Sequence, residues 1–190
     1  MSSTLLSRPI EVSRYGLIYA GAQKNIGPAG LTIVIIRKDL LVKAPAVGPL
    51  MLDYKIHAEN QSMYNTPPTY SWYIANLVFE WLEKKGGLAK MAEANRKKSE
   101  KLYSYIDTSG FYQNPVEVSC RSWMNIPFTL PRAEMDSDFL EGAKKVGLLA
   151  LKGHKLVGGM RASLYNAMPE AGVDALIEYM KAFSARHGKG

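Results

Sequence analysis

Two apolar runs near the start of the chain predict a pair of β-strands. Residues 15–20 read YGLIYA, and residues 31–37 read LTIVIIR, a continuous β-branched run typical of a strand that is covered on both faces. The glycine-rich stretch GAQKNIGPAG, residues 21–30, forms the bend between them. Residues 42–66 are expected to be irregular, because prolines, glycines and polar residues interrupt any period there.

Helical periodicity follows in the middle of the chain. After NTPPT, apolar residues fall at helical spacing until the glycines at 86–87 end the pattern. The residues that define this first helix are Tyr70, Tyr73, Ile74, Leu77, Val78, Trp81 and Leu82. A second helix is expected over residues 88–106, directly after the two glycines.

The second half of the chain has a different character. The pattern predicts a strand over 122–130, a capped helix over 136–147, strands over 148–153 and 158–166 around a tight turn, and a last helix that opens near Pro169. That last helix is expected to bury Val173, Leu176, Ile177 and Met180. We therefore expect a boundary near residue 109. Residues 1–108 are interpreted as part of a larger α/β domain, and residues 109–190 as a small α+β domain.

Composition indicates a soluble globular protein. Of the 190 residues, 47% are hydrophobic and 22% are charged, and no apolar run reaches membrane-spanning length. The first residues have neither the basic leader nor the apolar segment of a secretory signal. Cys120 is the only cysteine, which fits a reducing compartment. We therefore expect a cytoplasmic protein without a membrane partner.

The formal net charge of +7 favours anionic partners but does not choose between nucleic acid and small acidic substrates. Basic residues are concentrated between residues 84 and 101. We interpret them as the solvated face of the second helix, because no aromatic residues interleave with them as a single-strand binder requires. The residues expected to turn inward are Leu88, Met91, Ala92, Leu102 and Ile106. No nucleic-acid partner is predicted.

Lys24 raises the question of chemistry. A lysine among small residues between two strands is either the tip of an ordinary hairpin or a buried amine held for reaction. A lysine amine becomes a nucleophile, able to form a Schiff base with a carbonyl, when burial or cationic neighbours lower its pKa. The residues by themselves leave both interpretations open.

Four segments resemble one enzyme family in its order and spacing. They are YGLIYAGAQKNIGPAGLTIVIIRKDLL, SMYNTPPTYSWYIANLVFEWL, RSWMNIPF and ALKGHKLVGGMRASLYNAMP. They resemble phosphoserine aminotransferases, which are fold-type I, class-V enzymes that use pyridoxal 5′-phosphate (PLP), and the similarity runs from about residue 5 to the end. It implies an α/β fold: the carboxyl-terminal part of a fold-type I transferase, with a remnant of the large domain before the small one. It also implies a homodimer with a shared active site, and a role in serine biosynthesis and, in bacteria, pyridoxine biosynthesis.

The resemblance further implies which residues hold the cofactor. Lys24 would form the Schiff base with PLP and then move a proton between substrate Cα and cofactor. Gln23 would hydrogen-bond the cofactor phosphate, and Asn65 and Thr66 would reach that phosphate from the neighbouring subunit. From the residues alone, Asn65 and Thr66 before two prolines also read as a plain helix cap. No metal is expected.

The substrate would be held near the other end of the chain. By resemblance, Arg161 binds the α-carboxylate of the substrate, and His154 and Lys155 bind its phosphate or the side-chain carboxylate of glutamate. From the residues alone, Arg161 could be a simple surface charge and His154 an ordinary exposed turn residue. The substrates implied are small molecules: phosphoserine, 3-phosphooxypyruvate, glutamate and 2-oxoglutarate.

The sequence departs from the family in two ways. The family commonly has arginine where Lys155 stands, and lysine lacks the planar fork of arginine. Family members also carry a long amino-terminal portion, with an aspartate that pairs with the cofactor nitrogen just before a Met-Ser-Ser run like Met1–Ser3. The chain by itself is therefore expected to be poorly active. Two alternatives remain: a truncated non-catalytic fragment, or another fold-type I aminotransferase for an acidic substrate.

Overall fold

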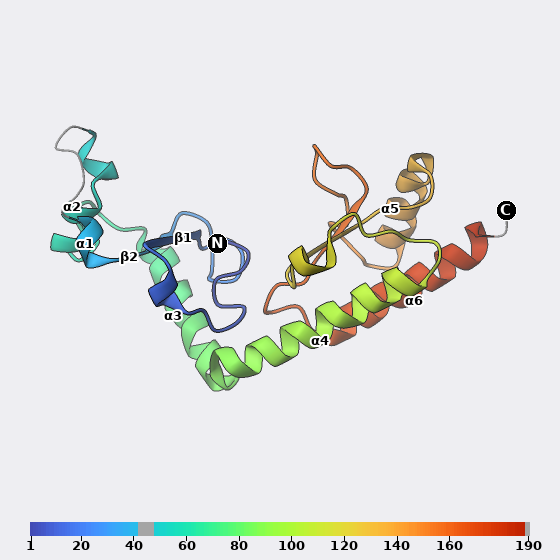
Figure 1. Cartoon of the computed structure of the whole chain (residues 1–190), viewed down its shortest axis with the longest axis horizontal. Coiled ribbons are helices and arrows are strands. Elements are labelled where there is room, and N and C mark those ends of the chain that lie inside the picture. The colour runs from blue at the N-terminus through green and yellow to red at the C-terminus, as the bar shows by residue number, and fades with distance from the viewer. Residues whose placement is uncertain (42–47, 189–190) are drawn as a thin grey trace. The chain divides into compact units, whose positions relative to one another are not determined.

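The computed structural model describes residues 1–41 and 48–188 (Figure 1). Contacts divide the chain into two units, Met1–Lys90 and Met91–Gly190. This division falls inside helix α4, Gly87–Thr108, whereas the pattern of elements predicts a boundary after that helix. The domain assignment 1–108 and 109–190 stays a prediction. In the described residues every helix is too short or too polar to cross a bilayer.

The first unit contains the predicted strand pair and the first long helix. Strands β1, Leu17–Gly21, and β2, Thr32–Ile36, form an antiparallel two-stranded sheet in which Gly21 pairs with Thr32. Helix α3 spans Thr69–Lys84. The shorter helices are η1, Val12–Arg14; α1, Lys38–Leu41; η2, Leu50–Leu52; and α2, Tyr54–Glu59. The expectation of irregular structure over 42–66 is therefore wrong at α2 and η2, and residues 42–47 lie outside the described residues.

The sheet of the first unit is covered on one face only. The small hydrophobic core on that face consists of Leu5, Ile18, Ala20, Ala22, Ile26 and Ala75. On β2, however, Val34 and its cross-strand partner Tyr19 are exposed on the face away from this core, so the prediction that this strand is covered on both faces is wrong for the described residues. The apolar run identifies a strand correctly, but burial of its second face needs a further layer, and none of the described residues of this unit supplies one.

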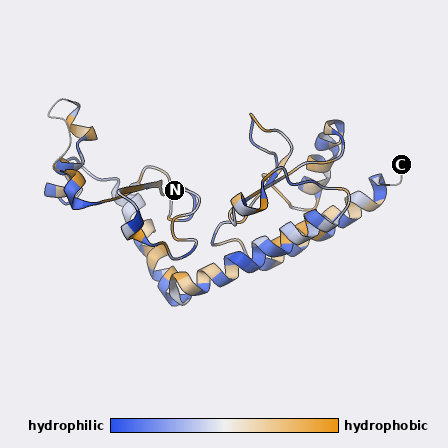
Figure 2. Ribbon diagram, viewed as in Figure 1, coloured by the Kyte–Doolittle hydropathy of each residue, from blue (hydrophilic) through white to orange (hydrophobic). Residues whose placement is uncertain are grey.

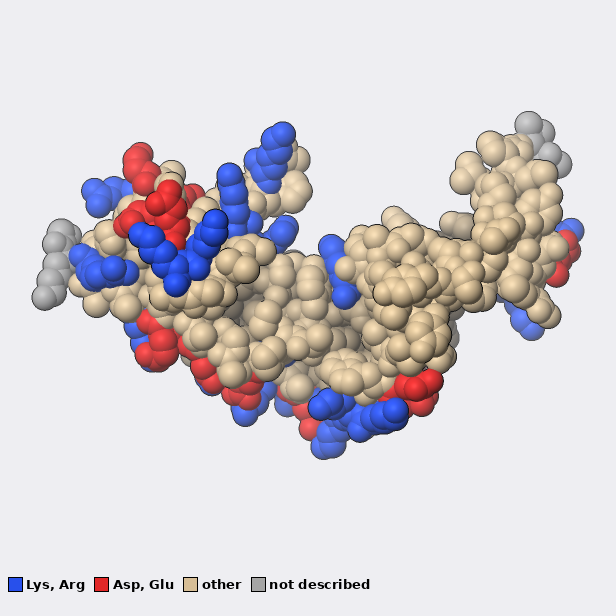
Figure 3. Space-filling view, turned by 180° about the vertical axis from the view of Figure 1, so that it is seen from behind, with Lys and Arg blue, Asp and Glu red and all other residues tan. Residues whose placement is uncertain are grey.

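Exposed apolar side chains are frequent in the first unit. Among them are Tyr19, Leu50, Met51, Leu52, Met63, Tyr64, Tyr70, Tyr73 and Leu77. In Figure 3 the same unit shows a broad surface without charged side chains. Many exposed apolar side chains on a surface without charged groups are typical of a protein–protein interface.

The second unit packs three helices on a small sheet. Strands β3, Asn125–Phe128, and β4, Met160–Ser163, are antiparallel. Single bridges at Gln113–Thr129 and Lys152–Met160 continue the sheet on both sides. The helices are α4, α5 (Asp136–Lys145) and α6 (Glu170–His187), with short turns η3 (Val118–Cys120) and η4 (Ala133–Met135). The core contains Phe128, Phe139, Met160, Val173, Met180 and Phe183.

The strand predicted over 148–153 is reduced to the Lys152 bridge. Ala150 adopts a positive φ of 59°, which takes the backbone out of the extended region. The predicted strands over 122–130 and 158–166 form, but over four residues each. The predicted helices at α5 and α6 are confirmed.

Helix α4 confirms the solvated-face interpretation with one exception. Its apolar and polar residues alternate along the ribbon (Figure 2). Met91, Leu102 and Ile106 are buried, and most of its basic residues are exposed. Lys98, by contrast, is 3% exposed, and its Nζ donates hydrogen bonds to the carbonyl oxygens of Tyr165 at 3.0 Å and Met168 at 2.8 Å. It therefore ties the segment before α6 to α4.

Burial gives Lys98 a distinct pH dependence. Desolvation lowers the pKa of Lys98 from 10.5 to about 8. Between these values the unfolded chain holds a proton on Lys98 that the folded chain has lost, so stability rises with pH there. We expect the free energy of unfolding of the wild-type chain to increase relative to that of Lys98→Met through this window. Urea unfolding of both chains below, within and above the window measures this difference.

The comparison with Lys98→Met cancels the contributions of the other titrating groups to the pH dependence of the unfolding free energy. Both chains carry the buried tyrosines, such as Tyr103, whose pKa burial raises to about 12, so their contributions cancel. A difference in unfolding free energy that stays constant or falls across the window would contradict the assignment.

Candidate functional site

Lys24 is exposed in the loop that joins β1 to β2. The alternative of a buried amine is therefore wrong for the described residues. The physical reason is local, because Ala22 and Ile26 fill the space beneath the loop and leave Lys24 outside the small core. What remains is a hairpin loop that presents an amine on its surface.

Hydrogen bonds fix the loop on both sides of Lys24. The N–H of Ala22 donates to the carbonyl oxygen of Leu31 at 2.8 Å, and the carbonyl oxygen of Ala22 accepts from Gly27 at 2.7 Å. The buried amide of Asn25 donates to the carbonyl oxygen of Ser3 at 2.9 Å. A loop with anchored ends holds its exposed side chains in a defined place, which reduces the ordering cost of binding.

Gln23 lies against the end of β1. A Cβ added at Gly21 would collide with the carboxamide of Gln23. The missing side chain of Gly21 therefore leaves room for Gln23 to fold back beside the strand. Gln23 and Lys24, which are consecutive in the loop, are both exposed.

Asn65 and Thr66 do not cap α3. The N-cap position of α3 is Pro68, with no side-chain capping bond, so the plain helix-cap interpretation is wrong. Both residues are exposed, and Nδ2 of Asn65 lies 3.3 Å from the carbonyl oxygen of Thr66. Each of the two prolines that follow disfavours helical backbone in the residue before it, which is why the helix begins after them.

Asn65 lines a cavity of about 430 Å³ in the first unit. The other lining residues include Thr32, Val34, Met51, Tyr54, His57, Pro67 and Trp72. Neither Gln23 nor Lys24 is part of this lining. The imidazole Nε2 of His57 is 2.9 Å from the carbonyl oxygen of Met51.

Sequence reasoning missed Tyr54, His57 and Trp72 as lining residues. Tyr54 and His57 come from α2 and Trp72 from α3, and only His57 and Trp72 stand within eight residues of Asn65 in the sequence. That proximity is the one signal in the chain that could have found any of them.

The turn with His154 and Lys155 is closed by glycines. The N–H of Gly153 donates to the carbonyl oxygen of Gly159 at 2.8 Å. A Cβ on Gly153 would collide with the carbonyl oxygen of Gly158, so the two arms of the turn approach as only glycine permits. His154 and Lys155 are exposed, and Nδ1 of His154 accepts from a turn N–H at 3.3 Å.

Arg161 is not a simple surface charge. It lies on β4, and its Nε is buried without a hydrogen-bond partner in the described part of the chain. A buried donor without a partner costs free energy, which an anion bound to the guanidinium would recover. The turn and β4 are consecutive, so the side chains of His154, Lys155 and Arg161 come from one short stretch.

The predicted site residues fall into two sets. Gln23, Lys24, Asn65 and Thr66 lie in the first unit, and His154, Lys155 and Arg161 lie in the second. The first set offers a primary amine, which can condense with an aldehyde, and amide and hydroxyl donors suited to phosphate. The second set offers cations for carboxylate or phosphate. These donors fit PLP and an acidic amino acid.

Comparisons with known proteins agree with this chemistry. A family model described as aminotransferase class-V matches residues 1–176. A curated phosphoserine aminotransferase of Hahella chejuensis is 62% identical over 187 residues, which are 98% of this chain and 52% of the relative. One from Pseudomonas aeruginosa is 60% identical over 188 residues, 99% of this chain and 52% of the relative.

Solved structures give the same result. Phosphoserine aminotransferase from Bacillus circulans subsp. alkalophilus superposes with a TM-score of 0.95 at 46% identity, over 98% of this chain and 52% of that one. The PLP-bound enzyme from Trichomonas vaginalis gives 0.90 at 46% identity, over 95% and 52%. The chain thus spans about half the length of the relatives it matches.

Proposed function

The chain belongs to the aminotransferase class-V family, and we propose that its protein transfers the amino group of O-phospho-L-serine to 2-oxoglutarate. The products are 3-phosphooxypyruvate and L-glutamate. The similarity to curated phosphoserine aminotransferases supports this reaction. The geometric observation that carries the proposal is the buried Nε of Arg161, which has no hydrogen-bond partner in the described residues and directly follows a turn with two further basic side chains.

The proposed cofactor is PLP. Lys24 is assigned to hold its aldehyde and Gln23 to hydrogen-bond its phosphate, since both are exposed on one anchored loop. When bound, PLP supplies the electron sink for negative charge at the substrate Cα.

The chain's own residues supply orientation and proton transfer. The amine of Lys24 would move a proton between the substrate Cα and the cofactor, as a positioned general base and acid. The guanidinium of Arg161 orients the α-carboxylate. His154 and Lys155 bind the distal phosphate or carboxylate, which selects an amino acid with two anionic ends.

A homodimer with a shared active site is part of the proposal. Asn65 and Thr66 are assigned to the cofactor phosphate of the neighbouring subunit. The exposed apolar residues Met63, Tyr64 and Tyr70 near them in the chain support an interface at this part of the first unit. If the protein sediments entirely as a monomer at micromolar concentration, the homodimer proposal is contradicted.

The proposed setting is serine biosynthesis, and in bacteria also pyridoxine biosynthesis, in the cytoplasm. Cys120 is a free, exposed thiol, which fits a reducing compartment. The proposed partners are small molecules, without nucleic acid or membrane. Recovery of the protein in the membrane pellet after cell fractionation would contradict this localisation.

O-Phospho-L-serine is expected to be the best amino donor. Its phosphate gains charge-assisted hydrogen bonds from His154 and Lys155, so its kcat/KM should exceed that of L-aspartate and L-alanine at least about tenfold. The measurement is keto-acid release from each donor with PLP and 2-oxoglutarate, at protein concentrations where a single turnover is visible. Lys155→Ala should reduce the advantage, whereas Leu156→Ala, at an 89% exposed position in the same turn, should preserve it.

Lys155 itself favours a second candidate. Lysine keeps the charge of arginine but lacks the planar fork that binds phosphate through two hydrogen bonds. The second candidate function is therefore a fold-type I aminotransferase that uses another acidic amino acid as its amino donor. The same assay separates these functions, because L-aspartate would then match or exceed O-phospho-L-serine. Absence of keto-acid release from every donor would identify the chain as a non-catalytic fragment.

A further inference from the structure

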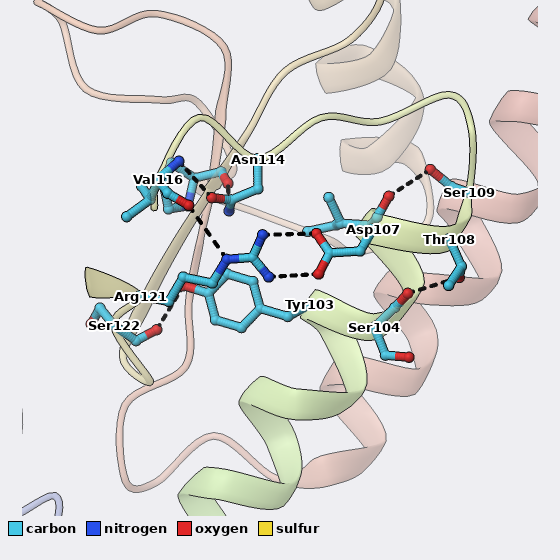
Figure 4. A network of polar contacts seen from close by, with 11 residues as sticks. Tyr103, Ser104, Asp107, Thr108, Ser109, Asn114, Val116, Arg121 and Ser122 are labelled. Atoms are coloured by element: carbon cyan, nitrogen blue, oxygen red, sulfur yellow. Dashed lines mark hydrogen bonds and ion pairs between the residues drawn. The ribbon is translucent and has the colours of Figure 1, made fainter. Parts of the chain in front are cut away.

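A polar network joins the end of α4 to the segment before β3 (Figure 4). The guanidinium of Arg121 forms two hydrogen bonds with the carboxylate of Asp107, at 2.6 and 2.9 Å, and its Cζ lies 4.7 Å from the centre of the Tyr103 ring. The side chain of Arg121 is 15% exposed. A bidentate arginine over an aromatic ring is held in one geometry. Arg121 therefore fixes its own segment against α4.

Asn114 continues this connection to β3. Its Oδ1 accepts a hydrogen bond from the N–H of Val116 at 2.8 Å, and its Nδ2 donates to the carbonyl oxygen of Pro127 at 2.6 Å. Nε of Arg121 lies 3.5 Å from the carbonyl oxygen of Val116. One carboxamide thus closes a local turn and links that turn to the strand.

Pro127 faces Arg161 across the strand pair. The two residues are partners in the antiparallel register. Proline has no N–H, and the N–H of Arg161 donates to the carbonyl oxygen of Leu151 at 2.7 Å. They therefore form a non-hydrogen-bonded pair, the kind in which side chains lie closest.

Strand alternation places Pro127 and Arg161 on the face away from the core. Their neighbours on the two strands are all buried in the core: Ile126, Phe128, Met160 and Ala162. The orientation of the Arg161 side chain therefore depends on how β3 is held beside it.

We propose that Asn114 is a positioning residue for Arg161, acting through the backbone of β3. Loss of the bond from Asn114 to Pro127 loosens β3 at the residue opposite Arg161, and the guanidinium must then be ordered again when an anion binds. The inference rests on the proposed function in one step only, the binding of a substrate carboxylate by Arg161.

The test compares Asn114→Asp with Thr108→Ala in the ¹⁵N-labelled 190-residue chain. Aspartate at 114 keeps the oxygen that accepts from Val116 but removes the donor to Pro127, so the turn is retained and the link to β3 is lost. Thr108→Ala removes a hydrogen bond within α4 and leaves the link intact. The Nε–H cross-peak of Arg161, assigned by its disappearance in Arg161→Lys, reports the guanidinium directly.

Asn114→Asp is expected to shift the Arg161 cross-peak and to speed exchange of its Nε proton with water by about three- to tenfold. Thr108→Ala should change neither. An unchanged Arg161 signal in Asn114→Asp, or an equal change in both variants, overturns the positioning role.

Titration of the same cross-peak with L-glutamate tests the proposed function separately. Weakening of that binding by about three- to tenfold in Asn114→Asp supports both ideas. If the wild-type cross-peak does not respond to L-glutamate, the carboxylate role of Arg161 fails, and the exchange rate still decides whether Asn114 positions it.

Discussion

Replacing Lys24 with alanine is expected to abolish the covalent attachment of PLP and to lower amino transfer by about 10²- to 10⁴-fold, the range that a positioned acid–base group contributes. The amine lies on a loop whose ends are held by hydrogen bonds at Ala22 and Asn25, and Lys24 is the only lysine of residues 21–30. The measurement is borohydride reduction at one equivalent of PLP, followed by peptide mapping of the labelled residue.

Lys85→Ala is the matched control for Lys24→Ala. Lys85 is also an exposed lysine of the first unit, and its loss should leave the label on Lys24 unchanged. Equal labelling of another lysine in the wild-type chain and in Lys24→Ala would exclude Lys24 as the attachment site.

Replacing Phe139 with alanine is expected to destabilise the second unit by about 3–5 kcal/mol. Phe139 is fully buried, and its ring meets four others edge-on: Tyr112, Phe128, Tyr179 and Phe183, with centroids 5.0 to 6.1 Å away. Truncation leaves a cavity and removes these aromatic contacts together. Urea unfolding, followed by hydrogen exchange of peptides from residues 91–188, measures the change in unfolding free energy.

Val118→Ala provides the contrast for Phe139→Ala. Val118 lies in the same unit but is 69% exposed, so its truncation should change the unfolding free energy by less than about 0.5 kcal/mol. A loss for Phe139→Ala as small as that of Val118→Ala would show that the aromatic cluster does not stabilise the unit as inferred.

Local patterns predicted most of the elements. Helices α3, α4 and α6 follow from apolar residues at helical spacing, and β1 and β2 follow from two β-branched runs around a glycine-rich bend. The pattern failed where the outcome depended on distant residues. Val34 lies in a strand as expected, yet it is exposed because no described residue of its unit covers the face on which it lies.

The candidate site was predicted in part. The lysine loop and the glycine-rich turn could be found from sequence, because a tight approach such as that of Gly153 to Gly158 requires glycine. The buried Nε of Arg161 could not, since burial of a single atom depends on tertiary contacts that the sequence pattern does not show. The link from Asn114 to Pro127 joins two segments that have no shared sequence signal.

By itself, the sequence determined most of the helices and strands. It also determined the resemblance to an aminotransferase family and the residues that carry it, because these depend on short-range periodicity and on motifs within single segments. Only the tertiary structure decided which charges are buried, such as Lys98, and which side chains meet across the fold, such as Arg121 with Asp107. Those outcomes depend on the desolvation and packing of residues far apart in the chain, which no local pattern encodes.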